Sequence, residues 1–289
     1  MFSELLIHPT TSAQLKAFVA KPSHALLLIG PNGSGKVTLA RRLAAELLKM
    51  PVAKLDGSPS FVWIGRPEGK QDIPIDDVRS LKKQLSLKVP GRDEVRRVVL
   101  IEDAHFMNTE AQNAFLKSLE EPPEGTLFIL TTISDKRLLP TVVSRTSSII
   151  VRPVSLETAK IYFADKPGME AAWELSQGTP ALFNSLLSED EHELKTTVSQ
   201  AKEFLGKNRY ERLLELNKLA QNKVEMDSFL DALSRVIRAL SRSSIGKGNK
   251  SLAGKSLRAS RLISQVREDL QANVSPKLAA LRLAVRLPL

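Results

Sequence analysis

A glycine-rich loop constrains the fold of this chain more than any other feature of its sequence. The run Gly30-Pro31-Asn32-Gly33-Ser34-Gly35-Lys36 matches the pattern Gly-x-x-x-x-Gly-Lys, and it follows a short apolar segment at residues 25–29. Small residues let successive backbone N–H groups curl around a phosphate, while the next helix and the lysine ammonium add positive potential. The loop predicts a strand–loop–helix unit that binds a nucleotide phosphate. The alternative is a glycine-rich turn without a ligand.

The residue after the lysine departs from this pattern. Val37 stands where a Ser or Thr hydroxyl would ligate Mg²⁺, and Thr38 comes one residue later, about 100° further round a helix. Phosphoryl transfer depends on a correctly held Mg²⁺, so we expect ATP or ADP binding with weak or absent Mg²⁺ and little intrinsic hydrolysis. The candidate nucleotide-binding residues are Gly30, Asn32, Gly33, Ser34, Gly35, Lys36, Val37 and Thr38.

A second departure follows the apolar run at residues 98–101, which ends in Glu102 and Asp103. The partner strand of such a loop normally ends in an Asp that supports Mg²⁺, followed by a Glu that orients the attacking water. Here the order is reversed, so one carboxylate is a methylene too long and the other a methylene too short. This degenerate acidic pair favours an inactive site. A strand end whose acids are merely solvated is the alternative.

The first half of the chain alternates between strand and helix patterns. Further strands are predicted at residues 61–64, 95–101, 126–132 and 147–151, and this alternation is typical of a parallel sheet covered by helices. After Pro153 the pattern is helical to the end of the chain. Residues 243–250, rich in Ser, Gly and Lys, have the composition of a flexible loop within it.

The net charge and its distribution along the chain indicate which kinds of partner to consider. The 42 Lys and Arg exceed the 32 Asp and Glu by ten. Residues 231–289 contain 12 Lys and Arg but only three Asp and Glu, so this segment carries a net charge of +9 out of the +10 of the whole chain. A basic stretch hints at nucleic acid, but few aromatic residues accompany it, so a stacking platform for single strands is not indicated. Solvated helix faces and acidic neighbouring proteins remain open as explanations.

The chain contains no cysteine and only four histidines. Disulfides and a cysteine-based zinc site are therefore excluded, and the histidines show no metal-ligand spacing. No apolar run approaches the length of a membrane span. We expect a cytoplasmic protein that binds no metal and no membrane.

Several motifs together resemble the clamp-loader subunits of bacterial DNA polymerase III, which are AAA+ proteins. Residues 101–107 and 111–123 carry the resemblance most specifically, the latter through its Leu-Glu-Glu-Pro-Pro ending. Residues 128–132 resemble the sensor-one strand, with Thr132, or failing that Thr131, as the sensor. A threonine that only favours strand structure is the alternative. Residues 139–146 resemble the family's Ser-Arg-Cys motif, with Thr146 in place of the cysteine.

The resemblance implies an α/β P-loop AAA+ domain with a parallel sheet over residues 1–152. It further implies a helical lid domain over 153–206 and an all-helical C-terminal collar or oligomerisation domain over 207–289. The family's zinc module of four cysteines is missing, and residues 51–60 occupy its place. No zinc is therefore expected.

Within the family, the degraded motifs resemble the delta-prime type of subunit. This type implies a component of the DNA polymerase III holoenzyme that assembles with gamma/tau and delta subunits, the sliding clamp and primer-template DNA. Arg145 would then supply a trans arginine finger to ATP bound next door. An ordinary surface salt bridge is the alternative for Arg145. Two other functions remain open, namely an ATP-hydrolysing gamma/tau-type motor subunit and a basic nucleic-acid-binding protein.

Overall fold

The computed structural model describes residues 2, 4–67, 70, 72–86, 89, 93–163, 166, 168–188, 193–271 and 274–288. Their contacts divide the chain into two compact units, each described by itself below. The first, called the α/β unit, comprises residues 1–167 and 178–182. The second, called the helical unit, comprises residues 168–177 and 183–289. The three-domain division expected from the sequence stays a proposal.

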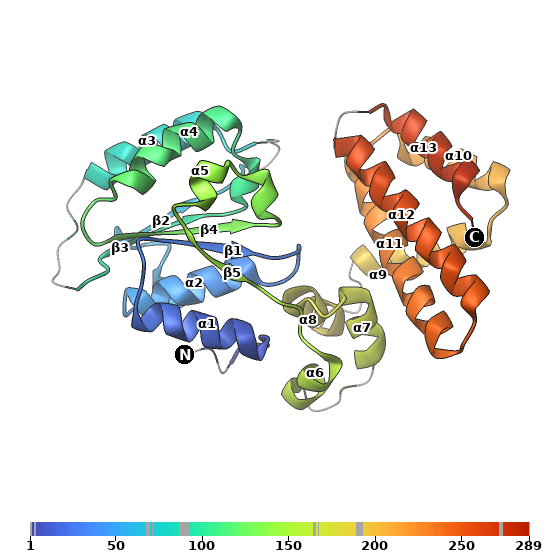
Figure 1. Cartoon of the computed structure of the whole chain (residues 1–289), viewed down its shortest axis with the longest axis horizontal. Coiled ribbons are helices and arrows are strands. Elements are labelled where there is room, and N and C mark those ends of the chain that lie inside the picture. The colour runs from blue at the N-terminus through green and yellow to red at the C-terminus, as the bar shows by residue number, and fades with distance from the viewer. Residues whose placement is uncertain are drawn as a thin grey trace. The chain divides into compact units, whose positions relative to one another are not determined.

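The α/β unit contains a five-stranded sheet of order β2-β3-β4-β1-β5, in which every pairing is parallel. Figure 1 shows α1 and α2 on one face of this sheet and α3 and α4 on the other. The strands are β1 Ala25–Ile29, β2 Phe61–Ile64, β3 Arg97–Ile101, β4 Thr126–Thr132 and β5 Ser147–Ile150. The helices are α1 Pro9–Ala20, α2 Lys36–Leu47, α3 Ile75–Ser86, α4 Thr109–Glu120, α5 Pro140–Val143 and α6 Leu156–Phe163, with short 3-10 turns η1 Val52–Lys54, η2 Ala104–Phe106 and η3 Asp135–Arg137.

Alternation along the strands builds two cores, one on each face of the sheet. Leu26 and Leu28 of β1 pack with Leu43 of α2, whereas Leu27 between them packs with Phe115 of α4. Successive strand side chains point to opposite faces, so a strand covered on both faces must be apolar at every position. This requirement explains the continuous apolar runs from which the strands were predicted.

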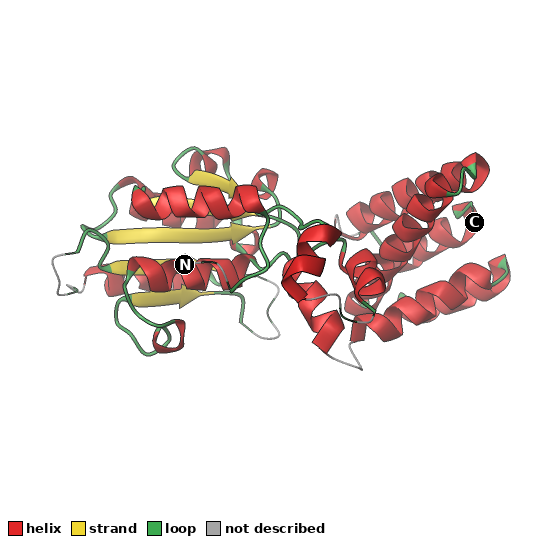
Figure 2. Ribbon diagram, turned by 90° about the horizontal axis from the view of Figure 1, so that it is seen from below, coloured by secondary structure: helices red, strands yellow, loops and turns green. Residues whose placement is uncertain are grey.

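The helical unit is built from helices alone (Figure 2). Its core lies among α9 to α13 and includes Phe204 and Phe229, whose rings meet edge to face at 5.2 Å. The helices that lie wholly within the helical unit are α7 Met169–Ser176, α9 Glu193–Gly206, α10 Arg209–Leu219, α11 Lys223–Gly246, α12 Lys250–Gln271 and α13 Pro276–Arg286. Helix α8, Pro180–Ser188, begins in the α/β unit and ends in the helical unit. None of the described helices combines the length and the apolarity needed to cross a membrane.

The flexible loop predicted over residues 243–250 is wrong. Helix α11 continues to Gly246 and α12 starts at Lys250, so only three residues form the turn. Ser244 is the one buried residue of this stretch, and its hydroxyl donates to the Leu240 carbonyl at 2.6 Å within α11. The other residues of the stretch are exposed, so its composition reflects contact with solvent and not a long loop.

Candidate nucleotide-binding site and the Arg145 edge

The glycine-rich loop lies at the carboxyl edge of the sheet. It follows β1, which is flanked by β4 and β5, and the Gly30 N–H donates to the Thr132 carbonyl at 3.0 Å. Gly33 and Gly35 have φ angles of 77° and 80°, a left-handed conformation that glycine adopts without a Cβ clash. The backbone conformation of the loop therefore explains why glycine stands at these two positions. Helix α2 begins at Lys36, directly after the loop, as predicted.

The Lys36 ammonium is folded back over the loop. It is buried and donates to the Gly30 carbonyl at 2.8 Å and the Pro31 carbonyl at 3.1 Å. Burial lowers the pKa of Lys36 below its ordinary value, and the carboxylates of Asp103 and Glu102 oppose that shift. The loop thus holds a cation beside its backbone, as a phosphate cradle requires.

Ser34 supplies a further polar atom inside the loop. Its side chain is 1% exposed, and its Oγ has no hydrogen-bond partner among the described residues. A buried hydroxyl without a partner costs free energy. Together with Lys36, this hydroxyl fits a loop arranged around an anion such as a nucleotide phosphate.

The start of α8 packs directly on the loop. The backbone N–H groups of Ala181 and Leu182 donate to the Gly33 carbonyl at 3.0 and 3.3 Å. A Cβ added to Gly33 would lie 2.9 Å from the Leu182 Cβ and 3.3 Å from the Thr179 Oγ1. Residues more than 140 positions apart are therefore joined at the candidate site, which sequence patterns did not indicate.

The hydroxyl expected to ligate Mg²⁺ is absent, and one of the two acids is engaged elsewhere. Val37 offers no donor atom and Thr38 is exposed. The Glu102 carboxylate accepts a hydrogen bond from the Trp63 indole N–H at 2.9 Å. No three His, Asp or Glu side chains in the described part of the chain are grouped as metal ligands would be. The residues present fit a phosphate and lack the hydroxyl that would hold a magnesium ion beside it.

The two threonines at the end of β4 are both fully buried. Thr131 Oγ1 accepts a hydrogen bond from the Asp103 N–H at 2.8 Å, and Asp103 itself has a left-handed φ of 47°. The Thr132 hydroxyl donates to the Ser134 carbonyl at 2.9 Å. Thr132 therefore lies beside the loop but uses its hydroxyl within its own turn, and its sensor role stays a prediction.

His105 lies two residues after the acidic pair and was not singled out in the sequence. Its ring stacks against Phe106 at 4.4 Å between centroids, and its Nδ1 is buried without a partner among the described residues. Burial lowers the pKa of His105 to about 4, an effect that Asp103 opposes and Arg137 reinforces. The ring is therefore neutral at physiological pH.

Arg145 lies at the opposite edge of the sheet from the loop. Strand β5 begins at Ser147, which pairs with Leu26, four residues before Gly30. At about 3.3 Å per strand residue, Arg145 is separated from Gly30 by more than about 13 Å along the strands. Arg145 therefore cannot serve a phosphate held by its own loop.

The Arg145 guanidinium is held in a defined position at this edge. It pairs with Glu120, the last residue of α4, at 2.8 Å, and it donates to the Thr141 carbonyl at 3.0 Å. Its side chain remains 36% exposed. At the start of α4, the Gln112 amide bridges the Met107 carbonyl and the Leu139 N–H at 2.9 and 2.7 Å and so fixes the residue before α5.

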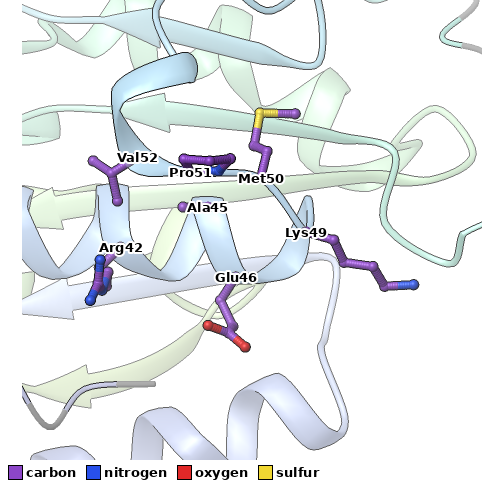
Figure 3. Close-up of a pocket in the computed structure, with 7 residues that line it drawn as sticks. All are labelled: Arg42, Ala45, Glu46, Lys49, Met50, Pro51 and Val52. Carbon is purple, nitrogen blue, oxygen red and sulfur yellow. The ribbon is translucent and has the colours of Figure 1, made fainter.

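A separate pocket of about 520 Å³ lies at the end of α2, between its last turns and the segment that follows it (Figure 3). Figure 3 shows the side chains of Glu46 and Lys49 pointing away from each other. Lys49 pairs with Asp93, and Arg42 pairs with Glu4. Ligand sites need polar groups that converge on one point, and these diverge, so the pocket is not a candidate site.

Comparison with known proteins finds relatives among the subunits of DNA polymerase III. Residues 8–155 match a family model described as DNA polymerase III, delta subunit. The chain is 33% identical over 201 residues to DNA polymerase III subunit delta' of Pseudomonas aeruginosa, covering 62% of this chain and 60% of that protein. It is 31% identical over 152 residues to subunit gamma/tau of Mycobacterium bovis, covering 48% of this chain and 26% of that protein. The matches thus span less than two thirds of these relatives' lengths.

A solved structure extends the likeness to nearly the whole chain. The DNA polymerase III gamma subunit-related protein of Thermotoga maritima superposes with a TM-score of 0.51 at 22% identity, covering 94% of this chain and 97% of that one. At this identity the likeness concerns the fold, which is the P-loop α/β unit with helical additions expected from the sequence. The family model matches just over half of the chain, and the protein therefore belongs to the DNA polymerase III delta subunit family of AAA+ clamp-loader proteins.

Proposed function

We propose that this protein is a delta-prime-type subunit of the clamp loader, which assembles with gamma/tau and delta subunits and promotes ATP hydrolysis on a neighbour. The observation that carries the proposal is the separation of two features. A loop that lacks magnesium ligands lies at one edge of the sheet, and an exposed arginine, Arg145, lies at the other. A subunit that stimulates ATP hydrolysis on a neighbour needs the arginine and can function without magnesium ligands of its own.

The proposed chemistry of Arg145 is electrostatic. A guanidinium is charged at every physiological pH and presents a planar fork of donors, which suits the charge that develops on a transferred phosphoryl group. Arginine fingers of this kind raise hydrolysis rates by about 10³ to 10⁵. The Glu120 carboxylate and the Thr141 carbonyl would hold the guanidinium ready until the neighbouring phosphate competes for it.

For the rest of the chain, we propose that residues 153–206 form the lid and residues 207–289 the collar that joins the subunits. An exposed apolar face on two packed helices supports the second assignment. This face, called the α10/α13 face, comprises Tyr210 and Leu214 of α10 and Leu278, Leu281 and Val285 of α13, exposed by 70, 47, 61, 46 and 57%. Five large apolar side chains exposed on two neighbouring helices are typical of a protein interface.

An ATP-hydrolysing motor subunit of the gamma/tau type is the second candidate, because one of the matched relatives is of that type. Val37 and the engaged Glu102 argue against it, since both remove support for Mg²⁺. The sliding clamp and primer-template DNA as partners, ATP or ADP as ligand, and a cytoplasmic location belong to the same proposal.

The test is Mg²⁺-dependent ATP hydrolysis by the isolated full chain in single-turnover conditions. We expect hydrolysis at the background rate, because no side chain places the metal. The variant Val37→Thr, which restores the missing hydroxyl, should also remain at background while Glu102 is engaged. Robust Mg²⁺-dependent turnover by the unaltered chain would contradict the delta-prime assignment and favour a motor subunit.

A further inference from the structure

The hairpin of α11 and α12 has an unusual charge composition. Residues 232–267 contain nine Lys and Arg and not one Asp or Glu. They cover most of both helices, which pack against each other and appear as the two long neighbouring helices of the helical unit in Figure 1. A solvated helix ordinarily mixes charges of both signs, so a stretch of this length without an acid is a distinct feature of the surface.

Acidic residues elsewhere in the helical unit neutralise three of the hairpin's arginines, on the side that faces α7 and the start of α11. Arg267 pairs with Asp227 at 3.1 Å and with Asp231 at 2.9 Å, and Arg235 pairs with Asp231 at 2.6 Å. Arg242 likewise pairs at 3.0 Å with Glu174 of α7. The basic residues close to α7 and to the start of α11 therefore contribute to the structure of the unit itself.

The turn and the exposed cations of the first three turns of α12 have no such neutralisation. We call this surface the hairpin tip, and it comprises five exposed cations. No carboxylate in the described part of the chain lies within ion-pair distance of them. They are Lys247, Lys250, Lys255, Arg258 and Arg261.

The geometry of α12 gathers three of these cations on one side. At 100° per residue, Arg261 lies about 20° from Lys250 around the helix and Arg258 about 80° from it. Their spacing along the axis is roughly 16 Å at 1.5 Å per residue, a length along which a nucleic-acid duplex carries about ten phosphate charges. The N-terminus of α12 also lies at the tip, and its dipole adds positive potential there.

We propose that the hairpin tip binds the phosphate backbone of duplex DNA, without reading its sequence. The exposed Ser243, Asn249 and Ser251 beside the cations are of the residue types that donate to phosphate oxygens. Residues 232–267 contain no aromatic side chain, so the hairpin has no group on which the bases of a single strand could stack. This contact depends on neither the glycine-rich loop nor Arg145.

An acidic segment of another protein is the competing occupant. Ile245 and Leu257, exposed by 68 and 51%, could contact apolar side chains of such a segment. They are two against five cations and three small polar groups, and protein interfaces are depleted in lysine, which supplies three of the five cations. The composition therefore favours phosphate.

The test measures binding of a fluorescein-labelled duplex of about 30 base pairs to the full chain, by anisotropy, over salt from about 50 to 200 mM. The perturbation is the triple variant Lys250→Gln/Arg258→Gln/Arg261→Gln. Each phosphate contact contributes about 0.9 to the slope of log affinity against log salt. We expect a slope shallower by about 2.7 and an affinity at least about tenfold weaker near 100 mM salt.

The matched control removes three exposed cations from α10 and α13 in the variant Lys218→Gln/Lys277→Gln/Arg286→Gln. Both variants have the same net charge, so only the position of the lost charges differs. The proposal requires the control to bind as the unaltered chain does. Equal losses in both variants, absence of duplex binding, or tighter binding of an oligoglutamate peptide than of the duplex would each overturn it.

Discussion

Substitution of Gly33 by alanine tests whether α8 is seated on the glycine-rich loop. The φ of 77° costs an alanine about 1–2 kcal/mol. Its Cβ would also lie 2.9 Å from the Leu182 Cβ, closer than side chains pack, and such overpacking costs about 1–3 kcal/mol. We therefore expect Gly33→Ala to lower the free energy of unfolding of the α/β unit by about 2–5 kcal/mol.

Gly35 provides the matched control. Its φ of 80° imposes the same backbone strain, but a Cβ at this position would meet nothing within 4 Å. Gly35→Ala should therefore cost only about 1–2 kcal/mol. The difference between the two variants isolates the contact with α8.

The assay is urea unfolding followed by tryptophan fluorescence. The chain has two tryptophans, Trp63 in the α/β unit and Trp173 in the helical unit. A Trp173→Phe background leaves Trp63 as the reporter for the unit that contains the loop. Equal losses of stability in Gly33→Ala and Gly35→Ala would refute the contact between α8 and the loop.

Two further predictions concern His105 and the α10/α13 face. Because the pKa of folded His105 is about 4 and that of an unfolded histidine is about 6.5, the unfolded state binds more protons between these values. The free energy of unfolding should therefore fall by about 2 kcal/mol from pH 7 to pH 5. The variant His105→Gln should lack this contribution, which urea unfolding at the two pH values measures. Leu278→Asp should change stability by less than about 0.5 kcal/mol yet block incorporation into a reconstituted clamp loader on size-exclusion chromatography. The similarly exposed Leu257→Asp should assemble normally, and equal behaviour of the two leucine variants would count against the face.

The sequence predicted the sheet well because its three central strands, β1, β3 and β4, are buried on both faces. Continuous apolar runs are a strong local signal, and three of the five strands have the predicted bounds. Helix α1 was not predicted, since only Thr11, Leu15 and Phe18 of its 12 residues are buried and its pattern is correspondingly weak. The flexible loop predicted over residues 243–250 is wrong because small polar residues are common both in loops and on the exposed sides of helix ends, and all but Ser244 are exposed here.

The candidate site was predictable where it depends on backbone geometry. Gly33, Gly35 and Lys36 are required by a loop that curls around a phosphate, and this requirement is local in sequence. The contacts of Trp63 with Glu102, of α8 with Gly33, and of Arg145 with Glu120 join distant segments. No local periodicity encodes them, so they became visible only once the fold was known.

The most direct test of the proposed function is the DNA-stimulated ATPase rate of a clamp loader reconstituted with Arg145→Ala. A trans arginine finger predicts a loss of at least about 10³-fold at the site that Arg145 serves, with normal assembly and normal ATP binding by the neighbouring subunit. Arg145→Lys should recover little, because an ammonium lacks the planar fork of donors. An unchanged rate at that site, in a complex shown to contain the variant, would contradict the account.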